Sequence, residues 1–153
     1  SPFLKNNNIS ISCAESCTGG MISSLITSVP GSSEYFLGSV TSYANGVKEN
    51  VLGVPAEIIA EHGAVSSECV AAMAEGVRRI TSSDYSVATS GIAGPGGGSE
   101  EKPVGTVWIG VSSDNGTETF RLKFNSDRKR NIERFSSSAL HILLNKIKTE
   151  LNN

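Results

Sequence analysis

Residues 9–26 of the chain read ISISCAESCTGGMISSLI, and this stretch decides the fold. From residue 9 to residue 13, isoleucine and cysteine alternate with serine, which is the period of a half-buried β-strand. After a turn, the apolar residues take up helical spacing, and Pro30 with Gly31 ends that helix. A strand that leads through a glycine-containing turn into a helix is typical of an α/β fold.

Four further segments of the chain are rich in β-forming residues. We expect strands over residues 36–43, 85–89, 104–111 and 117–124. The last two form a hairpin, because Asn115 and Gly116 between them supply the positive φ angles of a type I′ turn. Phe120, Leu122 and Phe124 alternate along its second strand and are expected to face the core.

The remaining apolar residues recur with the period of an α-helix. We expect short helices around residues 48–52 and 55–63, and long helices after the N-cap residues Ser66 and Asp127. The apolar face of the first long helix contains Val70, Met73, Ala74, Val77 and Ile80. The apolar face of the second contains Ile132, Phe135, Ala139, Ile142, Leu143 and Ile147.

Strands and helices follow one another without a repeat, a linker or a break in composition. The sequence therefore predicts one three-layer α/β/α domain with a mixed β-sheet over residues 1–153. Because the first residue is Ser1 rather than Met, we expect that the chain has been trimmed or that other residues precede it.

Composition narrows the class of protein. Thirteen Lys and Arg against 15 Asp and Glu give a net charge of −2, which argues against a broad basic face for a nucleic acid. No apolar run approaches the ~20 residues that span a bilayer, and no signal peptide opens the chain. Cys13, Cys17 and Cys69 cannot all pair and lack the spacing of a zinc site. We therefore expect no metal, no cofactor, no membrane partner and a reducing, cytoplasmic setting.

The turn between the first strand and the first helix carries the first chemical signal. The first N–H groups of a helix have no partner within the helix, so a hydroxyl or thiol placed there faces a site for an anion. Ser16, Cys17 and Thr18 are all candidate nucleophiles, and Gly19 with Gly20 would let a ligand approach the backbone. The alternative is that these residues only cap the helix.

A hydroxyl nucleophile needs a base, and neither histidine is well placed for that role. His62 is expected at the end of a helix, and His141 on the last helix. Lys48 and Tyr43 are the remaining candidates, but a lysine acts as a base only if its pKa is lowered. The alternative is that Lys48 is an exposed lysine at the start of a helix.

Residues 90–98 form the third segment of interest, with five glycines whose unobstructed N–H groups suit a phosphate or a carboxylate. The segment is neither a Walker motif nor a GxGxxG motif, and it is also consistent with a mobile loop. Arg128, near the start of the last helix, could reach an anion at this loop. The alternative is that Arg128 is one of several solvated charges on that helix.

Seven segments of the chain occur in an order that closely resembles the CinA C-terminal domain family, the nicotinamide mononucleotide deamidases. They are AESCTGG (14–20), VPGSS (29–33), YANGVK (43–48), LGVP (52–55), HGAVS (62–66), SGIAGPGG (90–97) and KPVGTV (102–107). The sequence departs from the family pattern at Ser90, where threonine is common, and at Ser126, where glycine is usual. Neither departure removes a catalytic group.

The resemblance implies hydrolysis of the carboxamide of nicotinamide mononucleotide to nicotinate mononucleotide and ammonia. It implies Ser16 as the nucleophile, with Tyr43 and Lys48 completing the catalytic group. Only the resemblance selects Ser16 over its two neighbours. Family members occur alone or behind a molybdopterin-binding-like domain, and they tend to be homo-oligomers, so we expect a homo-oligomer, with a dimer favoured.

We expect the substrate to contact the first turn, the glycine-rich loop and the start of the last helix. The expected contact residues are Cys17, Thr18, Gly19, Gly20, Asn45, Ser90, Gly91, Ala93, Gly94, Gly96 and Arg128. The main alternative is a pyridine-nucleotide-binding module without catalytic activity, which would need the glycine-rich loop but no reactive serine.

Overall fold

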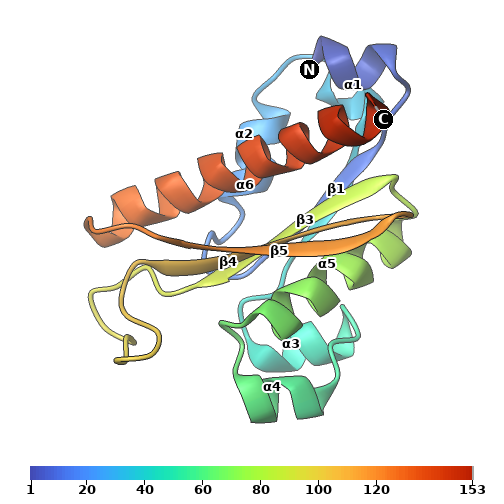
Figure 1. Ribbon diagram of the computed structural model, residues 1–153. Coiled ribbons are helices and arrows are strands. Elements are labelled where there is room, and N and C mark those ends of the chain that lie inside the picture. Colours follow the sequence, from blue (N-terminus) through green and yellow to red (C-terminus); the bar gives the residue numbers. More distant parts are fainter. Residues whose placement is uncertain (153) are drawn as a thin grey trace.

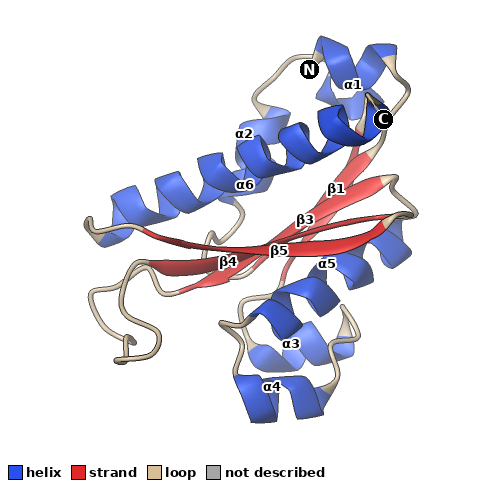
Figure 2. Cartoon of the chain, viewed as in Figure 1, coloured by secondary structure: helices blue, strands red, loops and turns tan. Residues whose placement is uncertain are grey.

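Helices cover both faces of a mixed β-sheet in the computed structural model (Figures 1 and 2). The structure describes residues 1–152, and Asn153, the last residue of the expected domain, lies outside the described residues. The predicted three-layer α/β/α architecture is therefore confirmed, as is the mixed sheet.

The five strands have the order β2-β1-β3-β4-β5 in the sheet. Strand β1 (Ile11–Glu15) runs parallel to β2 (Phe36–Thr41) on one side and parallel to β3 (Tyr85–Gly91) on the other. Strand β3 pairs antiparallel with β4 (Thr106–Ser113), which leads through a hairpin into β5 (Gly116–Lys123). The carboxyl ends of three parallel strands therefore meet at one edge of the sheet.

Six α-helices of the described chain form the two outer layers (Figure 1). One layer contains α1 (Pro2–Asn6), α2 (Met21–Thr27) and α6 (Arg128–Leu151). The other contains α3 (Asn45–Asn50), α4 (Ala56–His62) and α5 (Ser67–Thr81). A short 3₁₀ helix, η1 (Ser32–Glu34), precedes β2. Within residues 1–152 no helix is both long and apolar enough to cross a membrane.

Strand β1 is buried on both faces, so the expectation of a half-buried strand is wrong. The strand lies inside the sheet, runs parallel to both its neighbours, and is covered by helices from both sides, which leaves no solvent-facing side for Ser12. The hydroxyl of Ser12 instead forms a hydrogen bond with that of Ser83, at 2.7 Å. The hydroxyl of Ser12 thus has a hydrogen-bond partner inside the core.

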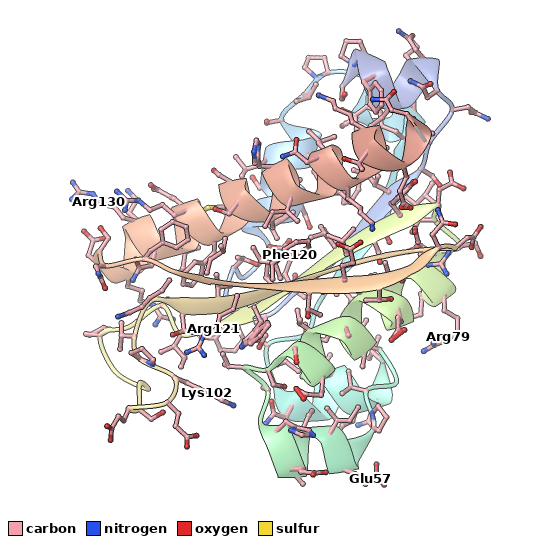
Figure 3. The ribbon with its side chains drawn as sticks, viewed as in Figure 1. Glu57, Arg79, Lys102, Phe120, Arg121 and Arg130 are labelled. Carbon is pink, nitrogen blue, oxygen red and sulfur yellow. The ribbon has the colours of Figure 1, made fainter. Side chains whose placement is uncertain are left out.

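Side chains divide into one core on each side of the sheet. Cys13 and Val87 pack toward the layer of α6, whereas Ala14 and Ala88 face α5. Figure 3 shows Phe120 of β5 between the sheet and α6, where it packs against the first core, as expected.

Two details of the elements differ from the expectation. Ser113 pairs with Gly116, so the turn of the hairpin is centred on Asp114 and Asn115, neither of which has a positive φ. The predicted type I′ turn at Asn115-Gly116 is wrong, because the N–H of Asn115 donates to the hydroxyl of Ser113 (3.1 Å) and only Gly116 takes a positive φ. Ile80, expected on the buried face of α5, is 49% exposed near the end of that helix.

The two ends of the described chain lie together (Figure 1). The amino group of Ser1 donates to the hydroxyl of Tyr35 (2.6 Å), and Nζ of Lys148 lies 5.6 Å from the ring centroid of Phe3. This corner is at the amino end of β1, away from the edge where β1 ends.

Gly76 of α5 provides a test of this packing, because a Cβ added there would collide with the backbone carbonyl of Leu52. Alanine normally stabilises a helix by up to ~1 kcal/mol relative to glycine. We expect Gly76→Ala instead to lower the free energy of unfolding by about 1–3 kcal/mol, as overpacking does. Gly46→Ala in α3, where a Cβ meets nothing within 4 Å, is the matched control and should be neutral or stabilising in urea unfolding. A stabilising Gly76→Ala would contradict the close approach.

Candidate active site

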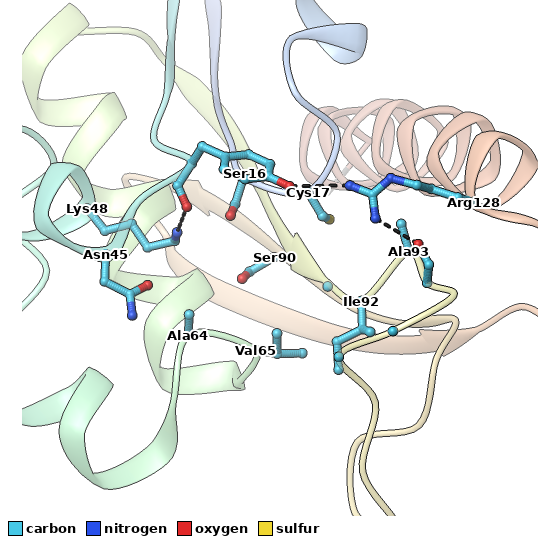
Figure 4. Close-up of a pocket in the computed structure, with 15 residues that line it drawn as sticks. Ser16, Cys17, Asn45, Lys48, Ala64, Val65, Ser90, Ile92, Ala93 and Arg128 are labelled. Carbon is cyan, nitrogen blue, oxygen red and sulfur yellow. Dashed lines mark hydrogen bonds between the residues drawn. The ribbon is translucent and has the colours of Figure 1, made fainter.

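A pocket of about 280 Å³ opens where β1, β2 and β3 end (Figure 4). In α/β proteins ligands bind at the carboxyl ends of parallel strands, at the point where successive connections leave in opposite directions. Strand β1 occupies that position here, because the chain continues from it to β2 on one side and reaches β3 on the other. The pocket therefore lies where the topology favours a ligand site.

Most of the residues predicted for the site line this pocket. The segments after β1 and β2 contribute Ser16, Cys17, Tyr43, Asn45 and Lys48. The end of β3 contributes Ser90 and Gly91, the loop after it contributes Ala93, Gly94 and Gly96, and the start of α6 contributes Arg128. Ile92 and Gly97, in the loop of residues 90–98 that was expected to contact the substrate, also line the pocket, whereas the lining residues Ala64 and Val65 were not predicted. Val65 and Ile92 lie in the HGAVS and SGIAGPGG motifs and give the pocket an apolar wall, a role that the sequence analysis did not assign to them.

Lys48 is buried, with a side chain 1% exposed, so the alternative of an exposed lysine is wrong. Its Nζ donates to the backbone carbonyls of Ser42 (2.8 Å) and Tyr43 (3.0 Å), and no ion pair within residues 1–152 includes it. Burial lowers the pKa of Lys48 below its ordinary value of 10.5, against the opposing influence of the nearby Cys69 and Cys17. The amine is therefore easier to deprotonate than an exposed lysine.

Ser16 follows β1 directly and is 8% exposed, with its hydroxyl in the pocket (Figure 4). Within residues 1–152 this hydroxyl has no hydrogen-bond partner, and in particular none to Lys48. The two side chains thus share one pocket without a direct hydrogen bond.

The other two candidate nucleophiles are differently placed. Burial raises the pKa of the Cys17 thiol to about 12, so the thiol stays protonated at neutral pH, in contrast to the lowered pKa that a helix N-terminus can produce. The Thr18 hydroxyl lies 2.7 Å from Oε1 of Glu15, to which it donates, and 3.0 Å from the hydroxyl of Thr89. Of the three, Ser16 has the hydroxyl that is free to react.

The expected contacts of Thr18, Gly19 and Gly20 with a ligand need correction, because none of the three lines the pocket. Thr18 is buried, and the N–H of Gly20 donates to Glu15. Helix α2 begins only at Met21, so the turn and the helix start are separate. The N–H groups of Cys17 and Thr18, in contrast, have no acceptor within residues 1–152.

Sequence reasoning did not single out the side chain of Glu15, which lies next to the pocket. Its side chain is fully buried and accepts hydrogen bonds from the N–H groups of Ile22 (2.9 Å) and Ser23 (3.0 Å) at the start of α2. The carboxylate of Glu15 therefore occupies the place at the N-terminus of α2 where free N–H groups would otherwise bind an anion. The sequence did contain a signal for this role: an acidic residue shortly before a helix whose N-cap, Gly20, has no side chain to cap it.

Arg128 connects two walls of the pocket, as Figure 4 shows. Its guanidinium donates to the carbonyl of Gly94 (2.7 Å) and to the hydroxyl of Tyr43 (3.3 Å). Tyr43 is 62% exposed, and it is its carbonyl, not its hydroxyl, that contacts Lys48. The alternative of a purely solvated Arg128 is therefore wrong.

The two histidines lie outside the pocket, as the sequence suggested. His62 is the last residue of α4 and lies 3.4 Å from a carboxylate oxygen of Glu68, and His141 is hydrogen-bonded to Asn145 on α6. Within residues 1–152 no three His, Cys, Asp or Glu side chains gather where they could hold a metal ion.

Fold and site together define a three-layer α/β domain with an unpartnered serine and a buried lysine in one pocket. The family model of the CinA C-terminal domain matches residues 2–147, and the chain belongs to this family. The family expected from the ordered motifs is therefore confirmed.

Curated relatives support the same assignment. The chain is 49% identical over 142 residues to a CinA-like protein of Pseudothermotoga lettingae, which covers 93% of this chain and 35% of the relative. A CinA-like protein of Thermotoga maritima is 47% identical over 141 residues, which covers 92% and 34%. The chain thus spans about a third of the length of these relatives.

Solved structures show the same fold. The competence damage-inducible protein A of Klebsiella pneumoniae superposes with a TM-score of 0.92 at 33% identity, over 96% of this chain and 91% of that one. The competence/damage inducible protein CihA of Agrobacterium tumefaciens gives 0.91 at 34% identity, over 94% and 88%.

The lowered pKa of Lys48 predicts a pH-dependent stability. Between the folded pKa of Lys48 and its unfolded value near 10.5, the unfolded chain binds more protons than the folded protein, so this group's contribution makes stability rise with pH. Below the folded pKa the charged, buried amine destabilises the fold by a constant amount. Methionine at this position does not titrate, so the stability of Lys48→Met relative to wild type should be greatest near neutral pH and decrease toward pH 10. Urea unfolding of both proteins at several pH values measures it, and a constant difference would contradict the lowered pKa.

Proposed function

We propose that this domain is an amidohydrolase that converts nicotinamide mononucleotide to nicotinate mononucleotide and ammonia, in the recycling of pyridine nucleotides. The observation that carries the proposal is the pairing, in one pocket, of a serine hydroxyl and a buried lysine that have, respectively, no hydrogen-bond partner and no carboxylate partner among residues 1–152. Serine with lysine is an established variant of the serine–histidine–aspartate arrangement. The family resemblance supplies the substrate.

In the first step Ser16 attacks the carboxamide carbon while neutral Lys48 accepts the hydroxyl proton. A neutral amine has two N–H bonds and one lone pair. The carbonyls of Ser42 and Tyr43 accept from the amine, which directs the lone pair away from them. Ser16 and Lys48 are not hydrogen-bonded in the free protein, so the step needs a rotation of the serine side chain or a bridging water, as is common before substrate binds.

The second step breaks the bond between carbon and nitrogen. The ammonium of Lys48 gives its proton to the leaving nitrogen, and ammonia departs from an acyl-enzyme on Ser16. Water then attacks the acyl carbon, Lys48 accepts its proton, and the carboxylate of nicotinate mononucleotide leaves as the serine regains its hydrogen. The two backbone carbonyls around Nζ stabilise the charged amine between these transfers.

The tetrahedral intermediates carry a negative oxygen that needs donors. The N–H groups of Cys17 and Thr18 are our candidates, because no acceptor within residues 1–152 occupies them. A donor of this kind contributes roughly 3–4 kcal/mol to the transition state in other enzymes. The donors adjoin the nucleophile in sequence, so one rigid turn would supply both.

The phosphate and ribose would lie against the glycine-rich loop after β3, with Arg128 at its edge. Arg128 already donates to Gly94 and Tyr43, and a phosphate would compete for these hydrogen bonds. The pyridine ring fits the apolar wall of Val65 and Ile92. Three free thiols suit a reducing compartment, so we also propose a cytoplasmic location.

A pyridine-nucleotide-binding module without catalysis is the second candidate, and the missing hydrogen bond between Ser16 and Lys48 favours it. Such a module would be stabilised against heat by nicotinamide mononucleotide and would release no ammonia. Measuring both properties on the same sample separates the two functions.

Replacing the nucleophile tests the mechanism directly. We expect Ser16→Ala to lower the rate of ammonia release by roughly 10³-fold or more, because no other free hydroxyl is available in the turn. The matched variant Cys17→Ala removes a protonated thiol and keeps the backbone N–H, so it should retain the rate within about tenfold. Ammonia release and thermal unfolding are measured for both, and the reverse order of the two effects would assign the nucleophile to Cys17.

The pH dependence of the rate tests the base. Only neutral Lys48 can accept the proton, so kcat/KM should rise with pH and level off above the pKa of Lys48, below the ordinary value of 10.5. We expect Lys48→Met to lose roughly 10²- to 10⁴-fold in rate, and Lys48→Arg to give no rescue, since arginine does not lose its proton. A Lys48→Arg variant with near wild-type activity would exclude a base at this position.

A further inference from the structure

The carboxylate of Glu15 stands at the centre of a buried hydrogen-bond network next to the pocket. It accepts from the hydroxyls of Thr18 (2.7 Å) and Ser23 (2.7 Å) and from the N–H groups of Gly20, Ile22 and Ser23. Glu15 is 0% exposed, and no ion pair within residues 1–152 includes it. Within residues 1–152 the carboxyl group is therefore held by hydrogen-bond donors and not by a basic side chain.

This network fixes the turn that contains Ser16 from both sides. Glu15 precedes Ser16 in the chain, and its side chain reaches past the serine to hold Thr18. The turn is closed by the N–H of Gly19, which donates to the carbonyl of Ser16 (3.0 Å), and by the N–H of Met21, which donates to that of Thr18 (3.0 Å). The N–H groups of Gly20, Ile22 and Ser23 donate to Glu15, whereas those of Cys17 and Thr18 have no acceptor among residues 1–152.

The same residue also connects to the strands that carry the rest of the pocket. Thr18 lies 3.0 Å from the hydroxyl of Thr89 on β3, immediately before Ser90. The backbone carbonyl of Glu15 accepts from the N–H of Ser42 (2.7 Å), and the carbonyl of Ser42 accepts from Lys48. Hydrogen bonds thus connect Glu15 both to the turn that carries Ser16 and, through Ser42, to Lys48.

We propose that Glu15 is a positioning residue: its carboxylate sets the direction of the Ser16 hydroxyl and leaves the N–H groups of Cys17 and Thr18 free for a ligand oxygen. This inference rests on the proposed function for its kinetic consequence. Its structural consequence, a turn conformation that depends on the carboxylate, can be measured without any activity.

Two variants remove the interaction in different ways. Glu15→Gln keeps the size of the side chain but replaces one accepting oxygen with an NH₂ group, which cannot accept hydrogen bonds from the donors around it. Thr18→Val keeps the shape of threonine and removes the hydroxyl that Glu15 binds, so it serves if Glu15→Gln fails to fold. Thr18→Ser retains the hydroxyl and is the conservative rescue. Val77→Ala, on the buried face of α5, controls for lost stability alone.

We expect Glu15→Gln and Thr18→Val to lower kcat for ammonia release by roughly 10- to 100-fold while KM changes less than about threefold, because a small displacement of reacting groups acts on the chemical step. In ¹H–¹⁵N spectra the amide signal of Cys17 should shift in both variants, and that of Thr18 should shift in Glu15→Gln. Thr18→Ser should recover most of kcat and keep the Cys17 signal, and Val77→Ala should alter neither kcat nor these signals.

An unshifted amide signal of Cys17 in Glu15→Gln and Thr18→Val would overturn the proposal, as would an unshifted Thr18 signal in Glu15→Gln or an equal loss of kcat in Val77→Ala. If the wild-type protein releases no ammonia from nicotinamide mononucleotide, the proposed function fails. The amide signals then decide the positioning role by themselves.

Discussion

The constraint on which the pocket depends is the burial of an amine without a carboxylate to neutralise it. A charged group in this position costs free energy unless it is hydrogen-bonded or loses its charge. Two main-chain carbonyls meet the N–H bonds of Lys48, and they are available because β2 ends at Thr41 and the chain turns there before α3. Backbone dipoles can hold the amine in either protonation state, whereas a carboxylate would have kept it charged.

The sequence predicted the architecture because periodicity reports directly which residues face a core. It predicted the order of strands and α-helices from β1 onward, the caps of α5 and α6, and most pocket residues, but it did not predict α1. The pocket residues were within reach because they lie at the ends of strands that a parallel arrangement brings together. It failed at β1, where alternation with serine suggested a solvent-facing side. Polar residues as small as serine satisfy one another inside the core, and periodicity cannot reveal that.

Two features of the site lay beyond the reach of local patterns. The depth at which Lys48 is buried depends on where the ends of α3 and β2 meet, and its partners are carbonyl groups that every residue has. The misplaced contacts of Thr18, Gly19 and Gly20 have a related cause. A glycine-rich turn ahead of a helix resembles an anion site in sequence, but here the nearby Glu15 already supplies the anion.

The meeting of the two chain ends at the amino end of β1 has a consequence for architecture on a larger scale. Because the pocket opens at the opposite end of that strand, a polypeptide joined to either end would be tethered on the far side of the molecule from the pocket. The relatives matched by this chain are about three times as long, so such attachments exist among them. A polypeptide attached at that corner would not block the opening of the pocket. A domain of this kind can therefore be joined to other domains without a change in the residues around the pocket.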